Sequence, residues 1–381
     1  MSLQNDKGLK LTLKTYSKDE NELLGYKIDG EPSSIKECLI PNETFLVRKG
    51  NEIIQIESQE EIEKDNNEEL LFLVKIRQDN NIKLFHPPKK NINFQTDEYV
   101  NNLDNKLWYI IKYNNESIQE LNDNYFLMEN DIIKIGNLKY VVYAINFEEE
   151  EEEEEKEEET KEEKEDDNEY ININKNSEMV FDSAPEIKDK RKCRFCECYN
   201  VSLCQCRQKV HFTCFKNNLN AKANSFENTK KTVTTYKLED FYCKKCKIPY
   251  PIKFRIEENN FRAIFDLFNF GKIPYLNYIM LESLGHKNKD GGYQKTVYII
   301  KLTEDVIKIG RNKDNDVIID DPSIKDFHAE IKYDKINKKI LFENKSDKPD
   351  VAVLIKKPLK MNNKKIHLQC GRTFFEAEIR I

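Results

Sequence analysis

The sequence predicts a mainly β protein of several domains, with a β-sandwich at each end and a small α+β segment between them. Three observations lead to this fold class. Residues 1–147 and 276–381 both carry short alternating apolar runs separated by polar turns. Eight of the ten cysteines fall within residues 193–246. An acidic run follows the first β-rich part, and a chain of 381 residues is long enough for two to four domains.

The N-terminal part, residues 1–147, is expected to form a β-sandwich. Leucines alternate at positions 9, 11 and 13, and further apolar runs follow up to Ile145. The stretch MENDIIKIGNLKYVVYAI, residues 128–145, has two apolar strands joined by a glycine turn. It resembles the last two strands of a forkhead-associated (FHA) domain, which implies a degenerate FHA-like fold for this part.

Residues 148–190 are expected to be a disordered or helical linker, because they hold few large apolar side chains. Residues 148–167 carry 16 acidic and 3 basic side chains, so the net charge of -7 leaves +6 for the rest of the chain. The run is interpreted as a spacer. The alternative is that it contacts the basic cysteine-rich segment that follows.

The cysteine-rich segment is expected to bind two zinc ions. Its candidate ligands form four closely spaced pairs: Cys193 and Cys196, Cys204 and Cys206, His211 and Cys214, and Cys243 and Cys246. Each pair is close enough for both side chains to hold one tetrahedral metal, and eight ligands correspond to two ions. A disulfide framework is the alternative, but the chain begins MSLQNDKGLK without an apolar signal core. We therefore expect a cytoplasmic or nuclear protein that is not secreted, and we leave Cys198 outside the ligand set.

The motifs CRFC, CQC, HFTC and CKKCKIPYP resemble the RING-variant (RING-CH) finger. The resemblance implies a small α+β finger at residues 191–254 in which the ligand pairs interleave, the first with the third and the second with the fourth. It also implies that a ubiquitin-conjugating enzyme would contact Phe195, Ile248 and Pro249. The tryptophan that the family places after the sixth ligand is Asn218 here, and the insert before Cys243 is polar.

A connecting helix is expected at residues 255–275. Phe261, Ile264, Phe265 and Phe268 follow helical spacing, and Gly271 would end the helix.

The C-terminal part, residues 276–381, contains VIKIGRNKDNDVIIDDPSIKDFHAEI, ILFENKSD and CGRTFFEAEIRI, which together resemble an FHA domain. The resemblance implies that Arg311, Lys325 and Ser346 face a phosphothreonine peptide. It assigns fold maintenance to Gly310, Asn315 and His328. Lys325 stands where the family has serine, and the usual Asn-Gly-Thr loop is replaced by residues 348–350. These departures predict weak phosphothreonine recognition, at most.

The leading hypothesis is an interaction scaffold that binds proteins through the FHA-type sandwich and the zinc segment. Together the two motifs resemble FHA/RING-CH proteins of ciliated protists. A ubiquitin ligase is the first alternative, and nucleic-acid binding by the basic zinc segment is the second, although no recognition helix accompanies the charge. No other catalytic motif occurs, and no apolar run approaches the length of a membrane span.

Overall fold

The computed structural model describes the chain in segments. They are residues 9–16, 32–40, 43–49, 52–56, 68–76, 82–85, 103, 106–111, 125–147, 179–180, 201–202, 209–210, 212–243, 250, 253–258, 261–266, 277–284, 286–287, 293–355, 359–361, 365–371 and 373–380. These segments are mainly β-strands and the turns that join them, and one helix, α4 (Phe212–Asn220), lies among them. The prediction of a mainly β protein is confirmed.

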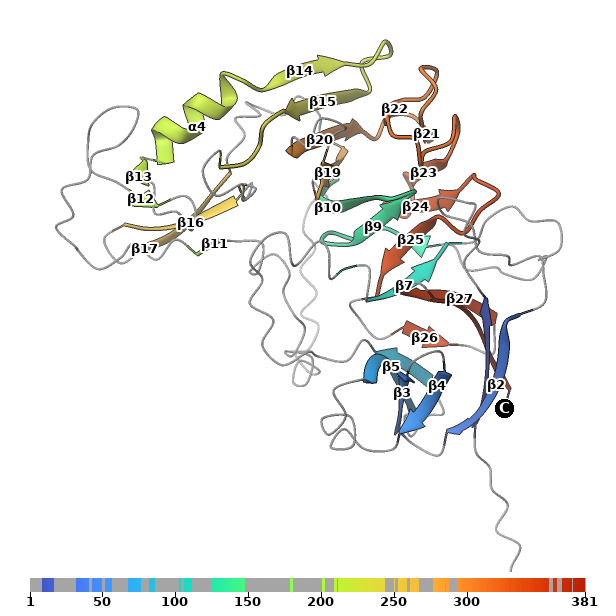
Figure 1. Ribbon diagram of the computed structural model, residues 1–381. Helices are drawn as coiled ribbons and strands as arrows, with labels where there is room; N and C mark the ends of the chain where they lie inside the picture. Colours follow the sequence, from blue (N-terminus) through green and yellow to red (C-terminus); the bar gives the residue numbers. More distant parts are fainter. Residues whose placement is uncertain are drawn as a thin grey trace, which may run out of the picture.

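One long sheet runs through the whole molecule, from β14 at one edge to β2 at the other (Figure 1). Its strands, in spatial order, are β14 (Asn224–Glu227), β15 (Val233–Leu238), β20 (Tyr293–Lys301), β18 (Tyr278–Ser283), β10 (Leu138–Asn146), β9 (Ile132–Ile135), β25 (Val351–Leu354), β7 (Leu107–Ile110), β27 (Lys365–Cys370), β28 (Thr373–Arg380), β1 (Leu9–Tyr16) and β2 (Ser34–Ile40). A short strand, β19 (His286–Lys287), also pairs with β20.

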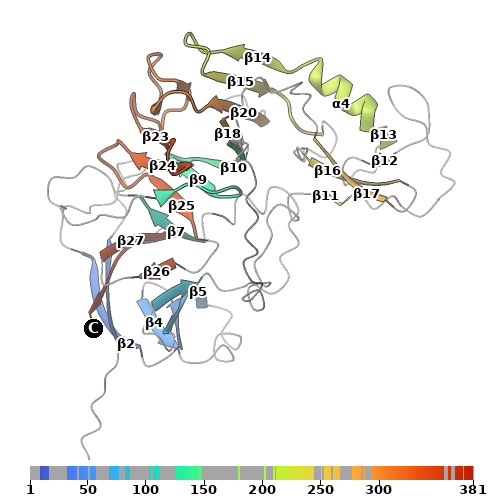
Figure 2. The same cartoon turned by 180° about the vertical axis from the view of Figure 1, so that it is seen from behind.

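Two five-stranded sheets complete two sandwiches with this long sheet. The first contains β22 (Val317–Ile318), β21 (Val306–Gly310), β23 (Ala329–Asp334), β24 (Lys339–Asn344) and β8 (Tyr125–Phe126). The second contains β26 (Leu359–Met361), β6 (Ile82–Phe85), β5 (Glu68–Ile76), β3 (Glu43–Lys49) and β4 (Glu52–Ile56). We call the sandwich that contains β21–β24 the C-terminal sandwich and the one that contains β3–β6 the N-terminal sandwich. Figure 2 shows them one above the other along the long sheet.

Alternation of apolar and polar residues places the core of the C-terminal sandwich between its two sheets. Ile307 and Ile309 of β21 are buried, whereas Val306 and Lys308, which alternate with them, face outward. The opposite side of the core comes largely from β9, β10, β18 and β20. The buried side chains of these strands form one cluster with those of β21, β23 and β24.

The predicted boundary at residue 147 is therefore wrong as a division between two independent sandwiches. Strands β8, β9 and β10 from the N-terminal part belong to the C-terminal sandwich, where β10 pairs with β18 and β8 pairs with β24. Conversely, β26, β27 and β28 from the C-terminal end complete the N-terminal sandwich, where β28 pairs with β1. The alternating pattern shows which face of a strand is apolar, but it does not show which strand will be its neighbour.

The segment predicted to be a zinc finger shares this long sheet. Its polar insert forms the hairpin β14–β15, and β15 pairs with β20 of the C-terminal sandwich. Helix α4 precedes the hairpin, and Phe215 and Leu219 on it pack in a cluster with Met280, Val297 and Ile299. Two short strands, β12 (Val201–Ser202) and β13 (Lys209–Val210), pair with each other before α4. The boundaries predicted at residues 191–254 therefore do not separate this segment from the C-terminal sheet.

The connecting helix predicted at residues 255–275 is wrong. A hairpin of β16 (Lys253–Glu258) and β17 (Phe261–Asp266) lies there instead. Its register places Phe254 opposite Phe265 and Ile256 opposite Ala263, so apolar residues meet in cross-strand pairs. In the sequence, Asn259 and Asn260 stand between the two strands, and asparagine favours turns.

Most of the predicted linker, residues 148–190, lies outside the described residues. Within it, β11 (Met179–Val180) pairs in parallel with β16. Among the helical residues that the structure describes, none forms a helix long and apolar enough to cross a membrane.

Candidate functional site

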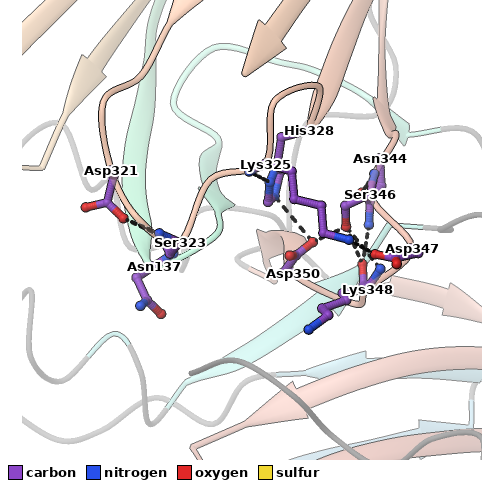
Figure 3. Close-up of polar contacts among 10 residues, drawn as sticks. All are labelled: Asn137, Asp321, Ser323, Lys325, His328, Asn344, Ser346, Asp347, Lys348 and Asp350. Carbon is purple, nitrogen blue, oxygen red and sulfur yellow. Dashed lines mark hydrogen bonds and ion pairs between the residues drawn. The ribbon is translucent and has the colours of Figure 1, made fainter. Parts of the chain in front are cut away.

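The predicted phosphopeptide-binding residues lie in three loops at one end of the C-terminal sandwich. Arg311 follows β21, Lys325 precedes β23, and Ser346 follows β24. Figure 3 shows that the side chain of Lys325 extends from its loop toward the loop that contains Ser346 and Asp350. The strand ends therefore bring together residues that are 35 positions apart in the sequence.

Gly310 and Asn315 hold the first loop against the second. A Cβ atom on Gly310 would lie 2.2 Å from the Asp326 carbonyl oxygen, so a side chain cannot fit there. The Asn315 side-chain amide donates hydrogen bonds to the carbonyl oxygens of Asn312, at 2.8 Å, and Asp326, at 2.5 Å. Both residues maintain the loop conformation, as the sequence predicted.

His328 joins the second loop to the third. Its side chain is fully buried, and its Nδ1 accepts a hydrogen bond of 3.0 Å from the Lys325 backbone N–H. Its carbonyl oxygen accepts hydrogen bonds from the backbone N–H groups of Lys345 and Ser346. Its Nε2 lies 3.3 Å from the buried Asp350 carboxylate. The structural role predicted for His328 follows from these contacts.

Arg311 is half exposed and its guanidinium is available at the surface. Its Nη2 lies 3.4 Å from the carboxylate of Asp326, which is itself 72% exposed. The Arg311 backbone N–H donates a hydrogen bond to the Lys325 carbonyl oxygen, so the two loops that carry the cations are fixed to each other.

Lys325 forms an ion pair with Asp347 in the third loop (Figure 3). Both side chains are exposed to a large degree, at 38% and 67%. Each of the two cations predicted to contact phosphate therefore has an aspartate partner on the neighbouring loops. A phosphate group would meet two carboxylates as well as two cations.

Ser346 is placed differently from the expectation, because its side chain points into the loop. The residue is 1% exposed, and its hydroxyl donates a hydrogen bond to Asp350 Oδ1 at 2.5 Å and lies 3.0 Å from the Lys348 carbonyl oxygen. In this conformation the hydroxyl stabilises the loop and does not face a ligand at the surface.

Sequence reasoning missed Asn344 and Asp350, which shape the third loop. The Asn344 Oδ1 accepts a hydrogen bond from the Ser346 N–H, and its amide donates one to the Lys348 carbonyl oxygen, both at 2.8 Å. An asparagine that bonds the backbone two residues ahead is a common turn device, so Asn344 before Lys345-Ser346 was the available signal. Asp350 gave no such signal, because its role depends on the distant His328.

Phe327 was also missed. It is 39% exposed beside the two cationic loops, and the ammonium group of Lys308 lies 6.0 Å from its ring centroid. This end of the sandwich therefore offers an aromatic side chain together with paired charges.

A turn from the zinc segment reaches the first loop. In the turn between β14 and β15, Lys230 Nζ lies 2.9 Å from the carboxylate of Asp316, which is almost fully buried. The hydrogen bond to Asp316 raises the pKa of the Lys230 ammonium group. The other Asp316 oxygen accepts a hydrogen bond from the Lys308 N–H, so Asp316 links the hairpin to β21.

Two of the predicted zinc ligands are described. Cys214 on α4 is partly buried, and Cys243 is buried after β15. Near them, the rings of Phe215 and Phe241 pack against Tyr250, with ring centroids 4.6 and 5.8 Å apart. The six remaining ligands lie outside the described residues, namely Cys193, Cys196, Cys204, Cys206, His211 and Cys246. Within the described residues, no group of three metal-ligating side chains is assembled.

The residues expected to contact a ubiquitin-conjugating enzyme also lie outside the described residues. They are Phe195, Ile248 and Pro249.

Comparison with known proteins identifies an FHA domain at residues 307–348. The match begins in β21 and ends in the loop after β24, so it contains Arg311, Lys325, His328 and Ser346. No curated protein and no solved structure matches the chain.

Proposed function

We propose that this protein is an interaction scaffold that docks other proteins on the loops of its FHA domain and recognises phosphothreonine weakly or not at all. The observation that carries the proposal is the internal pairing of both cations. Arg311 lies beside Asp326, and Lys325 pairs with Asp347. A phosphate would have to compete with these carboxylates for the two cations. The negative charges of the carboxylates would also repel a phosphate dianion at close range.

The buried hydroxyl of Ser346 supports the same function. A serine at the surface could donate a hydrogen bond to phosphate, whereas this one donates to Asp350. The remaining accessible features are the Arg311 guanidinium and the Phe327 ring, a combination frequent at protein–protein interfaces.

Calorimetry of the full chain against a phosphothreonine peptide library tests this proposal. We expect either flat titrations or binding weaker than micromolar, because contacts to two cations that are already paired with carboxylates fall well short of the ~8 kcal/mol that micromolar binding represents. Micromolar binding that is abolished by Arg311→Ala and absent for unphosphorylated peptides would contradict it.

The zinc segment is proposed to hold two ions and to stabilise its own fold by metal binding. The four closely spaced ligand pairs in the sequence support this part of the proposal, and Cys214 and Cys243 are the two of these ligands that the structure describes. Elemental analysis of the purified chain should give two zinc ions per molecule. A chain without zinc would contradict it.

Ubiquitin ligase activity is the second candidate function, and the RING-variant motifs favour it. The polar insert that separates the last ligand pair from the rest forms β14–β15 and joins the C-terminal sheet. The segment would therefore be held rigidly beside the FHA loops. Discharge of a ubiquitin-loaded conjugating enzyme that depends on Phe195 and Ile248 would establish this function, and no discharge across a broad enzyme panel would exclude it.

A further inference from the structure

The two sandwiches have the same strand order. In the long sheet, the C-terminal sandwich reads β20-β18-β10-β9-β25, and the N-terminal sandwich reads β2-β1-β28-β27-β7. In the facing sheets, the orders are β22-β21-β23-β24-β8 and β4-β3-β5-β6-β26. The strands that occupy matching positions in the two sandwiches also occur in the same order along the chain. This correspondence matches β1–β7 with β18 and β20–β25, and it matches β8–β10 with β26–β28.

The registers of matching strands agree as well. The β9–β10 hairpin turns at Gly136 and pairs Ile133 with Tyr140. The β27–β28 hairpin turns at Gly371 and pairs Leu368 with Phe375, the same offsets from its glycine. Both glycines have a backbone φ of +58°, a conformation in which glycine is favoured.

A local twofold relation lies where the two sandwiches meet. Strands β25 and β7 pair antiparallel, with Val353 opposite Tyr109. On their other sides, Val353 pairs with Ile133, and Tyr109 pairs with Leu368, which matches Ile133 in the second hairpin. Because each residue repeats the neighbours of the other, an approximate twofold axis passes between Tyr109 and Val353.

We infer that the chain consists of two copies of one ten-strand unit that exchange their last three strands, so that the N-terminal copy positions the binding loops of the C-terminal copy. The positioning of the binding loops rests on the proposed function of these loops, whereas the strand exchange does not. Each sandwich joins the first seven strands of one copy to the last three of the other. The acidic run and the zinc segment are inserted between the two copies.

The N-terminal copy reaches the binding loops through its β9–β10 turn. The Gly136 N–H donates a hydrogen bond of 2.9 Å to the Asp350 carbonyl oxygen in the third loop. The next N–H, of Asn137, donates one of 2.9 Å to the Ser323 hydroxyl in the second loop. A Cβ on Gly136 would lie 2.6 Å from Ser323 Oγ and 2.8 Å from its carbonyl oxygen. The turn and the loops therefore fit together only without a side chain at position 136.

The matching loop of the other copy has a different form. There, β3 and β4 pair antiparallel, with Lys49 opposite Glu52, and only two residues separate the strands in the sequence. In the C-terminal copy, β21 and β22 run parallel and are joined by the longer loop that carries Arg311 and Asn315. The loop that bears Arg311 thus has no equivalent in the N-terminal copy, and the copies have divided their roles.

Hydrogen exchange of the full chain tests the positioning role. Gly136→Ala should increase exchange in residues 323–328 and 345–350 by about tenfold or more, because the added methyl group forces the loops to move. Gly371→Ala places an alanine at the same positive φ in the other sandwich and is the matched control. Equal exchange in these loops for the two variants would overturn the role of the turn.

Cross-linking tests the exchange itself without any ligand. In the exchanged arrangement Lys14 of β1 lies opposite Glu376 of β28. Val141 holds the same position after Gly136 as Glu376 does after Gly371, so Lys14 would lie opposite Val141 if each copy kept its own strands. A protease recognition sequence inserted within residues 148–178 lets the two halves be separated after cross-linking.

The folded chain is treated with a short bismaleimide, cleaved, and resolved under denaturing conditions, with the wild-type sequence treated in parallel. In the variant with Lys14→Cys and Glu376→Cys, both halves should remain in one band. The intensity of this band should be at least five-fold higher than in wild type. The variant with Lys14→Cys and Val141→Cys should show no internal link in its N-terminal fragment by mass spectrometry. Halves that separate in the first variant, or a link in the second, would overturn the exchange. Neither result depends on peptide binding, so failure here is distinct from failure of the proposed function.

Discussion

The backbone N–H of Asn137 donates a hydrogen bond of 2.9 Å to the side-chain hydroxyl of Ser323, 186 residues further along the chain. The same hydroxyl donates to the Asp321 carboxylate at 2.6 Å. Ser323 thus connects a turn of the N-terminal copy to a loop that carries the candidate binding residues. The recognition end of the FHA domain depends on residues outside the matched range 307–348.

Replacement of Ser323 by alanine should lower the free energy of unfolding by about 0.5–1.5 kcal/mol, because the hydrogen bond from the Asn137 N–H to the buried Ser323 hydroxyl would be lost. Urea denaturation measures this change. Ser225→Ala, on the exposed strand β14, is the control and should have little effect. Equal stability of the two variants would show that the bond to Asn137 contributes nothing.

Ser346→Ala should also destabilise the protein by about 1–3 kcal/mol, since it removes the hydroxyl that donates to the buried Asp350 carboxylate and leaves only His328 Nε2 beside that group. Arg311→Ala should change stability by less than about 0.5 kcal/mol, because the Arg311 side chain is 48% exposed. Thermal unfolding of both variants distinguishes a loop-stabilising serine from a ligand-facing one. If Ser346→Ala is as stable as wild type, the serine is not the loop residue that its contacts indicate.

The hairpin of the zinc segment should stabilise the first binding loop through Lys230. Lys230→Met removes the cation beside the buried Asp316 carboxylate, and we expect a loss of about 0.5–1 kcal/mol at low salt. The loss should shrink in high salt, because Lys230 is 55% exposed and its charge is screened. Lys222→Met, at an exposed position before the hairpin, is the control. A salt-independent effect would point to lost packing instead of lost charge.

A fall in pH should weaken the contact between β1 and β28, because the Glu376 carboxylate becomes protonated. A hydrogen bond from His367, aided by Lys14 at 2.7 Å, lowers the pKa of the Glu376 carboxyl from 4.5 to about 2. A carboxyl with a depressed pKa stabilises the fold fully above pH 4.5, and this contribution is lost as the pH falls toward 2.

The stability difference between wild type and Glu376→Gln should therefore be constant above pH 4.5 and should shrink below it. Urea midpoints measured between pH 6 and pH 3 give this difference. Glu227→Gln, on the exposed strand β14, controls for the general effect of losing one carboxylate. A difference that does not change with pH would contradict the role of the ion pair.

Much of the C-terminal sandwich could be predicted from sequence, because local patterns determine its strands and turns. The apolar–glycine–apolar pattern identified β9–β10, and the resemblance of the segment around Gly310, Asn315 and His328 to an FHA domain identified the binding loops. The exchange could not be predicted, since two copies with similar strands offer the same edges to one another. Its register is set by pairings between residues hundreds of positions apart, such as Lys14 and Glu376.

The hairpin β16–β17 was missed for a different reason. Phe261, Ile264 and Phe265 satisfy helical spacing, but Phe261, Ala263 and Phe265 also alternate as in a strand. The neighbouring strand β16, with Phe254 and Ile256, decides between the two patterns by offering apolar cross-strand partners.

The ion pairs of Asp326 and Asp347 also depend on tertiary structure, because the sequence alone does not bring the β24–β25 loop to Lys325.

Calorimetry with the double variant Asp326→Asn, Asp347→Asn tests the central claim most directly. If these two aspartates mask Arg311 and Lys325, their neutralisation should strengthen binding of a phosphothreonine peptide by about tenfold, which corresponds to about 1.4 kcal/mol. Asp305→Asn removes one carboxylate at the opposite end of β21 and should leave affinity unchanged. A double variant that binds no better than wild type would contradict internal masking of the phosphate site.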